Sequence, residues 1–311
     1  MKNISENFPG YNTIKPMLDV INTCEATLEK DPENIDAHIG IADSYFALWC
    51  YGTIPYAEAI KEVKTAESIV LNLNDSLSDV HTLTALIKWS EWNWDGAEKE
   101  FNIAIDLDSN SAKANHWYAL YHAAMGQFEE SISLSKKAVQ LEPTSGYKIG
   151  LGSMYYFAQD FETLKKEMKD VISEDPDFAQ AYDWLGMAYI LLEEFDNSIE
   201  VYEKSAALSG RLAEILGGLG HAYGIAGRKN EAKEILDEML DYTLKYHIPP
   251  IQIAFVYAGL GDDDKVFGML ERAYKERSWE LIFMREEPWF DYLREDNRFK
   301  EFVSRLKFPK K

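Results

Sequence analysis

A 34-residue spacing of small and aromatic residues is the feature that most limits what this chain can fold into. Gly186, Gly220 and Ala254 follow one another at steps of 34, and a tyrosine stands three residues after each. A period of this length is typical of stacked helical hairpins, in which a small residue lets the second helix pack closely on the first. No such hairpin buries its apolar face alone, so the pattern predicts a solenoid in which each helix pair packs on the next.

The stretch Ala179–Leu212 carries the pattern most fully, and it resembles the tetratricopeptide repeat (TPR). The characteristic large, small, aromatic and second-helix positions of that repeat are held by Leu185, Gly186, Tyr189, Phe195 and Ser198. The resemblance implies an all-α, right-handed superhelical solenoid of antiparallel helix pairs, closed by a C-terminal capping helix.

Three further stretches, Trp92–Phe101, His116–Tyr121 and Val256–Gly261, narrow the resemblance. Together they are similar to the TPR module that follows winged-helix regulators, adenylate cyclases and serine/threonine kinases in prokaryotes. In that family the effector domain precedes the repeats. We therefore expect this chain to be either a free-standing repeat protein or an excised module.

The period also predicts the organisation of the chain. We expect a disordered start at 1–12, a half repeat at 13–34, about seven TPR-like repeats at 35–280, a cap at 281–306 and a frayed tail at 307–311. The distance between the small residues Ala42 and Ala85 exceeds the period, which indicates a longer turn before a helix over Tyr56–Leu73.

Charge and composition favour protein partners. The 311 residues include 53 acidic and 32 basic side chains, for a net charge of −21. This sign disfavours nucleic acid and anionic membrane surfaces, so we expect no binding to duplex DNA at physiological salt. No apolar run could span a bilayer, the N-terminus lacks a signal core, and two cysteines predict neither disulfides nor a zinc site. A cytoplasmic location follows as the expectation.

No arrangement of residues indicates an enzyme, a metal or a cofactor. His116 and His122 are six residues apart, which does not place both on one helical face. The glycines of residues 217–227 lack the Gly-Lys-Ser/Thr of a phosphate loop, so they predict close helix packing. Asp262, Asp263 and Asp264 are expected to begin a helix, with acidic residues at its positive end.

The resemblance also implies that the first helices of the pairs line a concave groove. The predicted groove residues are Phe46, Trp89, Lys113, His116, Trp117, Tyr156, Phe157, Asp183, Trp184, Met187 and His221. Their aromatic character suits a peptide or a bulky apolar group. The set lacks the basic and amide cluster that family members use to clamp a C-terminal carboxylate, which argues against a chaperone-tail adaptor. Alternatively, the aromatic residues fill a tightly wound superhelix and contact one another.

These observations predict a non-enzymatic scaffold that binds a protein or peptide partner in the groove. Trp117 and Trp184 are expected to anchor the partner, and Asp183 with Glu214 to favour a basic or neutral ligand. The alternative function is a sensory or regulatory module that controls a separate effector. The sequence leaves the oligomeric state open.

Overall fold

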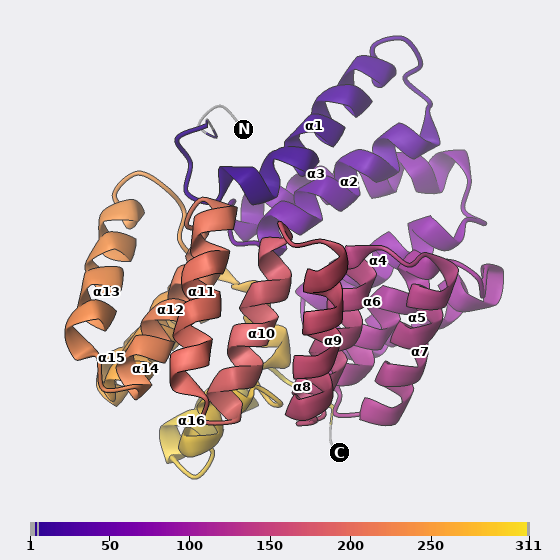
Figure 1. Ribbon diagram of the computed structural model, residues 1–311. Helices are drawn as coiled ribbons and strands as arrows, with labels where there is room; N and C mark the ends of the chain where they lie inside the picture. Colours follow the sequence, from indigo (N-terminus) through magenta and orange to yellow (C-terminus); the bar gives the residue numbers. More distant parts are fainter. Residues whose placement is uncertain (1–3, 5, 310–311) are drawn as a thin grey trace. The chain divides into compact units, whose positions relative to one another are not determined.

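The computed structural model describes residues 4 and 6–309, and the described part of the chain contains helices and no strands (Figure 1). The elements in chain order are α1 (Tyr11–Leu28), α2 (Ile35–Cys50), α3 (Tyr56–Leu73), α4 (Ser78–Ser90), α5 (Trp94–Leu107), α6 (Ala112–Ala124), α7 (Phe128–Leu141), α8 (Ser145–Phe157), α9 (Phe161–Glu174), α10 (Ala179–Leu191), α11 (Phe195–Ser209), α12 (Ala213–Ile225), α13 (Lys229–Thr243), α14 (Pro250–Leu260), α15 (Asp263–Glu276), the 3₁₀ helices η1 (Trp279–Phe283) and η2 (Pro288–Leu293), and α16 (Asn297–Ser304). Seven consecutive helix pairs extend from α2 with α3 to α14 with α15.

The chain forms two compact units. The α2–α7 unit comprises Ile14–Pro143, Trp279–Glu286 and Glu301–Lys311. The α8–α15 unit comprises Met1–Thr13, Thr144–Ser278 and Glu287–Lys300. Each unit therefore includes residues that follow α15, outside the repeat pattern.

Small residues set the distance between the two helices of a pair, as the period predicted. A Cβ atom added at Gly186 in α10 would lie 2.4 Å from the Tyr202 ring of α11. The Ser198 hydroxyl donates a 2.9 Å hydrogen bond to the Gly186 carbonyl, and Ser131 does the same to Ala119 at 2.8 Å. The tyrosines three residues after the small positions are equally buried. Tyr189, Tyr223 and Tyr257 are each 8% exposed.

A left-handed residue closes the first helix in each of the seven pairs. These residues are Gly52, Trp92, Gly126, Gln159, Glu193, Gly227 and Gly261, with φ between 58° and 79°. In each case the next residue donates its N–H to a carbonyl five positions earlier, as Glu194 does to Tyr189 at 2.8 Å. This is the Schellman arrangement, which satisfies carbonyls at a helix end.

The glycine-rich helix α12 is a packing element, as predicted. A Cβ atom at Gly224 would lie 2.4 Å from the Gly259 backbone of α14, and one at Gly217 would lie 2.6 Å from the Gln252 side chain. The predicted helix start at Asp262 is also confirmed, since its carboxylate accepts from the N–H of Lys265 at 3.3 Å and α15 follows.

Segments near both chain ends make aromatic contacts. Residues 1–3, 5 and 310–311 lie outside the described residues. Near the start, Phe8 packs edge-on against Tyr246 at 5.1 Å, and the N–H of Gly10 donates to the Gly210 carbonyl at 2.7 Å. Near the end, Phe308 stacks on Trp94 at 4.6 Å. The expectations of disorder over 1–12 and of fraying over 307–311 stay predictions.

We expect Gly186→Leu to destabilise the protein by about 1–3 kcal/mol, because the added side chain would overlap the Tyr202 ring. Gly268→Leu in α15 is the matched control, since a Cβ atom there meets nothing within 4 Å. Denaturant unfolding of both variants measures the difference. Equal stability of the two would contradict the tight packing of α10 on α11.

We expect Glu193→Gly to stabilise the protein by up to about 1 kcal/mol, because a left-handed conformation costs an L-residue about 1–2 kcal/mol, partly offset by the greater freedom of unfolded glycine. Gly227→Ala at the equivalent turn should destabilise the protein. Steric overlap should not contribute to this loss, because a Cβ atom at Gly227 meets nothing within 4 Å. Thermal melts of both variants test this. A loss of stability in Glu193→Gly would mean that the side chain outweighs the backbone.

Candidate functional site

The predicted groove residues lie on the first helices of successive pairs, and they divide between the two units. The α2–α7 unit holds Phe46, Trp89, Lys113, His116 and Trp117, and the α8–α15 unit holds Tyr156, Phe157, Asp183, Trp184, Met187 and His221. We call the surface formed by the first helices of a unit its inner face. Lys113, His116, Trp117, Trp184 and Met187 are half-buried, whereas the other six are buried. Their role in binding stays a prediction.

In the α2–α7 unit the inner face is a cluster of aromatic rings around Trp279. The helix η1 packs against α2, α4 and α6. The Trp279 ring contacts Trp89 at 5.3 Å, Phe46 at 5.7 Å and Trp117 at 6.0 Å, all edge-on. Edge-to-face pairs at such distances are favourable beyond the area that they bury. Three predicted groove residues therefore contact a segment of the same chain.

Lys113 is held by two carboxylates on neighbouring first helices. Its Nζ atom lies 2.6 Å from Asp43 of α2 and 3.2 Å from Asp79 of α4. Burial opposes the charge of Lys113, but the two carboxylates outweigh this effect and raise its pKa. His116, one turn along α6, is in the opposite situation, since burial lowers its pKa to about 4. Close to neutral pH this part of the face therefore holds a compensated lysine and a neutral imidazole.

In the α8–α15 unit the inner face holds Trp289 in the same manner. The Trp289 ring stacks on His221 at 4.5 Å with an interplanar angle of 6°, and it meets Phe255 edge-on at 4.7 Å. The Tyr156 hydroxyl donates to the Glu287 carboxylate. Burial raises the pKa of Glu287 to about 7, although the Tyr156 bond opposes that shift.

Asp183 is the most deeply buried acidic side chain of the predicted set, at 2% exposure. Burial raises its pKa to about 7, against the opposing effect of the Tyr202 hydroxyl. Asp183 Oδ1 and the Tyr202 hydroxyl each lack a hydrogen-bond partner of normal geometry among the described residues. Burial of a carboxyl is costly when the group is charged, which explains the preference for its neutral form.

Trp279 and Trp289, which occupy the centres of the two inner faces, were not among the predicted groove residues. Both lie in the stretch after α15, which has no place in the 34-residue period. The available signal was compositional: WELIF and PWF concentrate large apolar residues in what reads as a turn-rich cap. Such residues at a cap are expected to cover a core, but nothing in their spacing names the surface that they cover.

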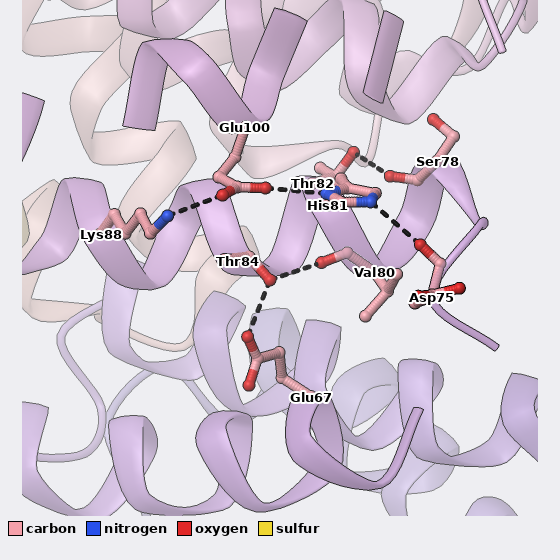
Figure 2. A network of polar contacts seen from close by, with 9 residues as sticks. All are labelled: Glu67, Asp75, Ser78, Val80, His81, Thr82, Thr84, Lys88 and Glu100. Carbon is pink, nitrogen blue, oxygen red and sulfur yellow. Dashed lines mark hydrogen bonds and ion pairs between the residues drawn. The ribbon is translucent and has the colours of Figure 1, made fainter. Parts of the chain in front are cut away.

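A polar network in the α2–α7 unit is centred on His81 and Glu100 (Figure 2). His81 Nδ1 lies 2.7 Å from the Glu100 carboxylate, and its Nε2 lies 3.0 Å from the Asp75 carbonyl. Lys88 also binds Glu100, at 2.6 Å. Burial would raise the pKa of Glu100, but these two partners lower it. Both ring nitrogens of His81 therefore lie within hydrogen-bond distance of oxygen atoms of the same unit.

The described residues contain no group of three or more His, Cys, Asp or Glu side chains placed to hold a metal ion. Among the described helices, none combines the length and the apolar character that a bilayer crossing requires.

The raised pKa of Asp183 predicts how the free energy of unfolding depends on pH. Its folded pKa is about 7, above the value near 3.9 of an unfolded aspartate, so the native state binds the extra proton. The free energy of unfolding should therefore fall as the pH rises from about 4 to about 7. Asp183→Asn should remove this loss, worth up to about 4 kcal/mol at about 1.4 kcal/mol per pKa unit.

Urea unfolding of the wild type and Asp183→Asn at pH 5 and pH 8 measures the effect. The advantage of the variant should be large at pH 8 and small at pH 5. Asp177→Asn, at an exposed position before α10, is the matched control. An advantage that does not change with pH would contradict a buried, titrating Asp183.

Comparisons with known proteins agree with this architecture. The family model described as Tetratricopeptide repeat matches residues 112–145 and 179–210, which contain α6 with α7 and α10 with α11. No curated protein sequence matches this chain.

Solved structures of low sequence identity are similar in fold. The crystal structure of the APC/C hetero-tetramer Cut9–Hcn1 aligns with a TM-score of 0.64 and 15% identity, over 93% of this chain and 52% of that one. An IFIT1 monomeric mutant with m7Gppp-AAAA aligns with a TM-score of 0.65 and 16% identity, over 94% and 67%. The human IFIT1 dimer with PPP-AAAA aligns with a TM-score of 0.61 and 17% identity, over 94% and 68%.

This chain thus spans about half the length of the Cut9–Hcn1 chain that it matches. Identities this low establish similarity of fold alone. The helix pairs, the matched repeats and the similar solved structures agree with one another and with the predicted fold class. The chain therefore contains tetratricopeptide repeats within an all-α superhelical solenoid of antiparallel helix pairs.

Proposed function

We propose that this chain is a non-enzymatic scaffold that binds a protein partner, as a peptide or a helix, on its inner faces. The observation that carries the proposal is that each inner face already holds a short 3₁₀ segment through ring contacts, by Trp279 in one unit and Trp289 in the other. A surface that binds a short segment of its own chain in this way has the chemistry to bind one from another chain.

Half-buried aromatic residues beside these segments support the proposal. Trp117 contacts Phe46 at 5.4 Å, and Trp184 contacts Tyr156 at 5.4 Å, so one side of each indole is held by packing. Both indoles keep part of their surface exposed. Tryptophans in this situation are common interface anchors, because they bury a large area at a small cost in side-chain entropy.

Charge supports a protein partner over nucleic acid. The excess of 53 acidic over 32 basic residues disfavours a phosphate backbone, and the Lys113 charge is compensated by Asp43 and Asp79. The RNA ligands of the IFIT1 structures belong to that protein. The proposed ligand is an apolar or aromatic segment whose flanking residues are neutral or basic.

The test replaces each proposed anchor by alanine. Trp117→Ala and Trp184→Ala should leave the thermal melt nearly unaltered and weaken, by at least tenfold, the binding of peptides selected from a random library on the full chain. Trp94→Ala is the matched control, because that indole is buried and donates to the Leu306 carbonyl at 3.0 Å. It should cost about 3–5 kcal/mol of stability.

Two results would contradict the proposal. One is a loss of stability in both variants as large as that of Trp94→Ala, which would make the indoles core residues. The other is unchanged affinity for the selected peptides, which would place the binding surface elsewhere.

A further inference from the structure

The segment Trp279–Phe283 lies on the inner face of the α2–α7 unit as a ligand would. Its two aromatic residues, four positions apart, both contact Trp89: Trp279 at 5.3 Å and Phe283 at 5.9 Å. Trp279 also meets Trp49 at 5.4 Å. Between the two rings, Leu281 and Ile282 are 0% and 1% exposed. Nearly the whole apolar content of the segment is therefore committed to this face.

A basic residue follows the apolar part of the segment. Arg285 donates from Nη2 to the carbonyl of Ala124 at 3.3 Å, at the C-terminal end of α6. A cation is favourable there, because the last carbonyls of a helix carry partial negative charge. The segment thus defines a recognition pattern of aromatic, any residue, aliphatic, aliphatic, aromatic, any residue and arginine.

The segment leaves one hydrogen-bond donor of this face without an acceptor. Trp89 is 0% exposed, and its Nε1 donor has no acceptor among the described residues. Trp279 remains half-buried although it stands at the centre of the cluster. A buried donor without an acceptor is unfavourable, so a ligand that offers an oxygen to Trp89 would gain an interaction that the chain's own segment lacks.

We propose that Trp279–Phe283 is a built-in competitor that closes the inner face of the α2–α7 unit. The external partner is a peptide with the same aromatic-x-aliphatic-aliphatic-aromatic pattern followed by a basic residue, which binds by displacing the segment. This inference rests on the proposed function and adds to it the chemistry of the partner and the control of access. Because the competitor is tethered, it acts at a high effective concentration, and the apparent affinity for a free peptide is reduced by the fraction of closed molecules.

The experiment uses the full chain and a fluorescein-labelled peptide of residues 277–286, RSWELIFMRE. Fluorescence anisotropy should give at least tenfold tighter binding to Trp279→Ala than to the wild type, since the variant weakens the tethered competitor. Tyr292→Ala is the matched control, because it removes an aromatic ring after α15 that is 54% exposed, and it should leave the affinity unchanged. A peptide with alanine in place of its tryptophan and phenylalanine should not bind.

Two further measurements separate displacement from general loosening. Saturating peptide should increase amide hydrogen exchange over 279–286 in the wild-type protein. Trp117→Ala, combined with Trp279→Ala, should weaken peptide binding by at least tenfold. If Trp279→Ala does not fold, Trp279→Phe replaces it. This variant should bind the peptide at least threefold more tightly than the wild type does.

The outcomes distinguish this inference from the proposed function. Equal affinity of the wild type and Trp279→Ala, still dependent on Trp117, would overturn the competitor and leave the binding face in place. An equal gain of affinity in Tyr292→Ala would also overturn it. Failure of the peptide to bind a folded Trp279→Ala variant would overturn both the competitor and peptide binding on this inner face.

Discussion

The close approach of helices at small residues is the constraint on which the rest of the structure depends. The Tyr202 ring of α11 would lie 2.4 Å from a Cβ atom at either Gly186 in α10 or Gly218 in α12. One ring therefore fits between two helices only because both positions lack a side chain. This contact joins the two helices of one pair to the first helix of the next, which is how a stack of pairs gains a continuous core.

The inner faces are rich in aromatic rings, and segments of the same chain cover part of each face. Trp89 and Tyr156 are buried, and segments that follow α15 cover both. Packing and binding were alternatives for these residues. The fully buried rings form the core of each face, whereas Trp117 and Trp184 keep part of their surface exposed. Their role in binding stays a proposal.

Burial also gives the inner faces an electrostatic character unlike that of the whole chain. The net charge is −21, yet burial lowers the pKa of His116 and of His221 to about 4 and raises that of Asp183 to about 7. The two imidazoles are therefore neutral at physiological pH, and the Asp183 carboxyl is only partly ionised. A partner would meet aromatic and weakly charged surface there.

The sequence by itself determined the features that depend on near neighbours in the chain. The 34-residue period predicted the helix pairs and the contact at Gly186, and a broken period correctly placed a helix over Tyr56–Leu73. These contacts recur one repeat apart, so periodicity encodes them. Only the tertiary structure decided that Trp279 and Trp289 occupy the inner faces. Neither tryptophan belongs to the period, and a residue outside it has no register that specifies which of several apolar surfaces it will cover.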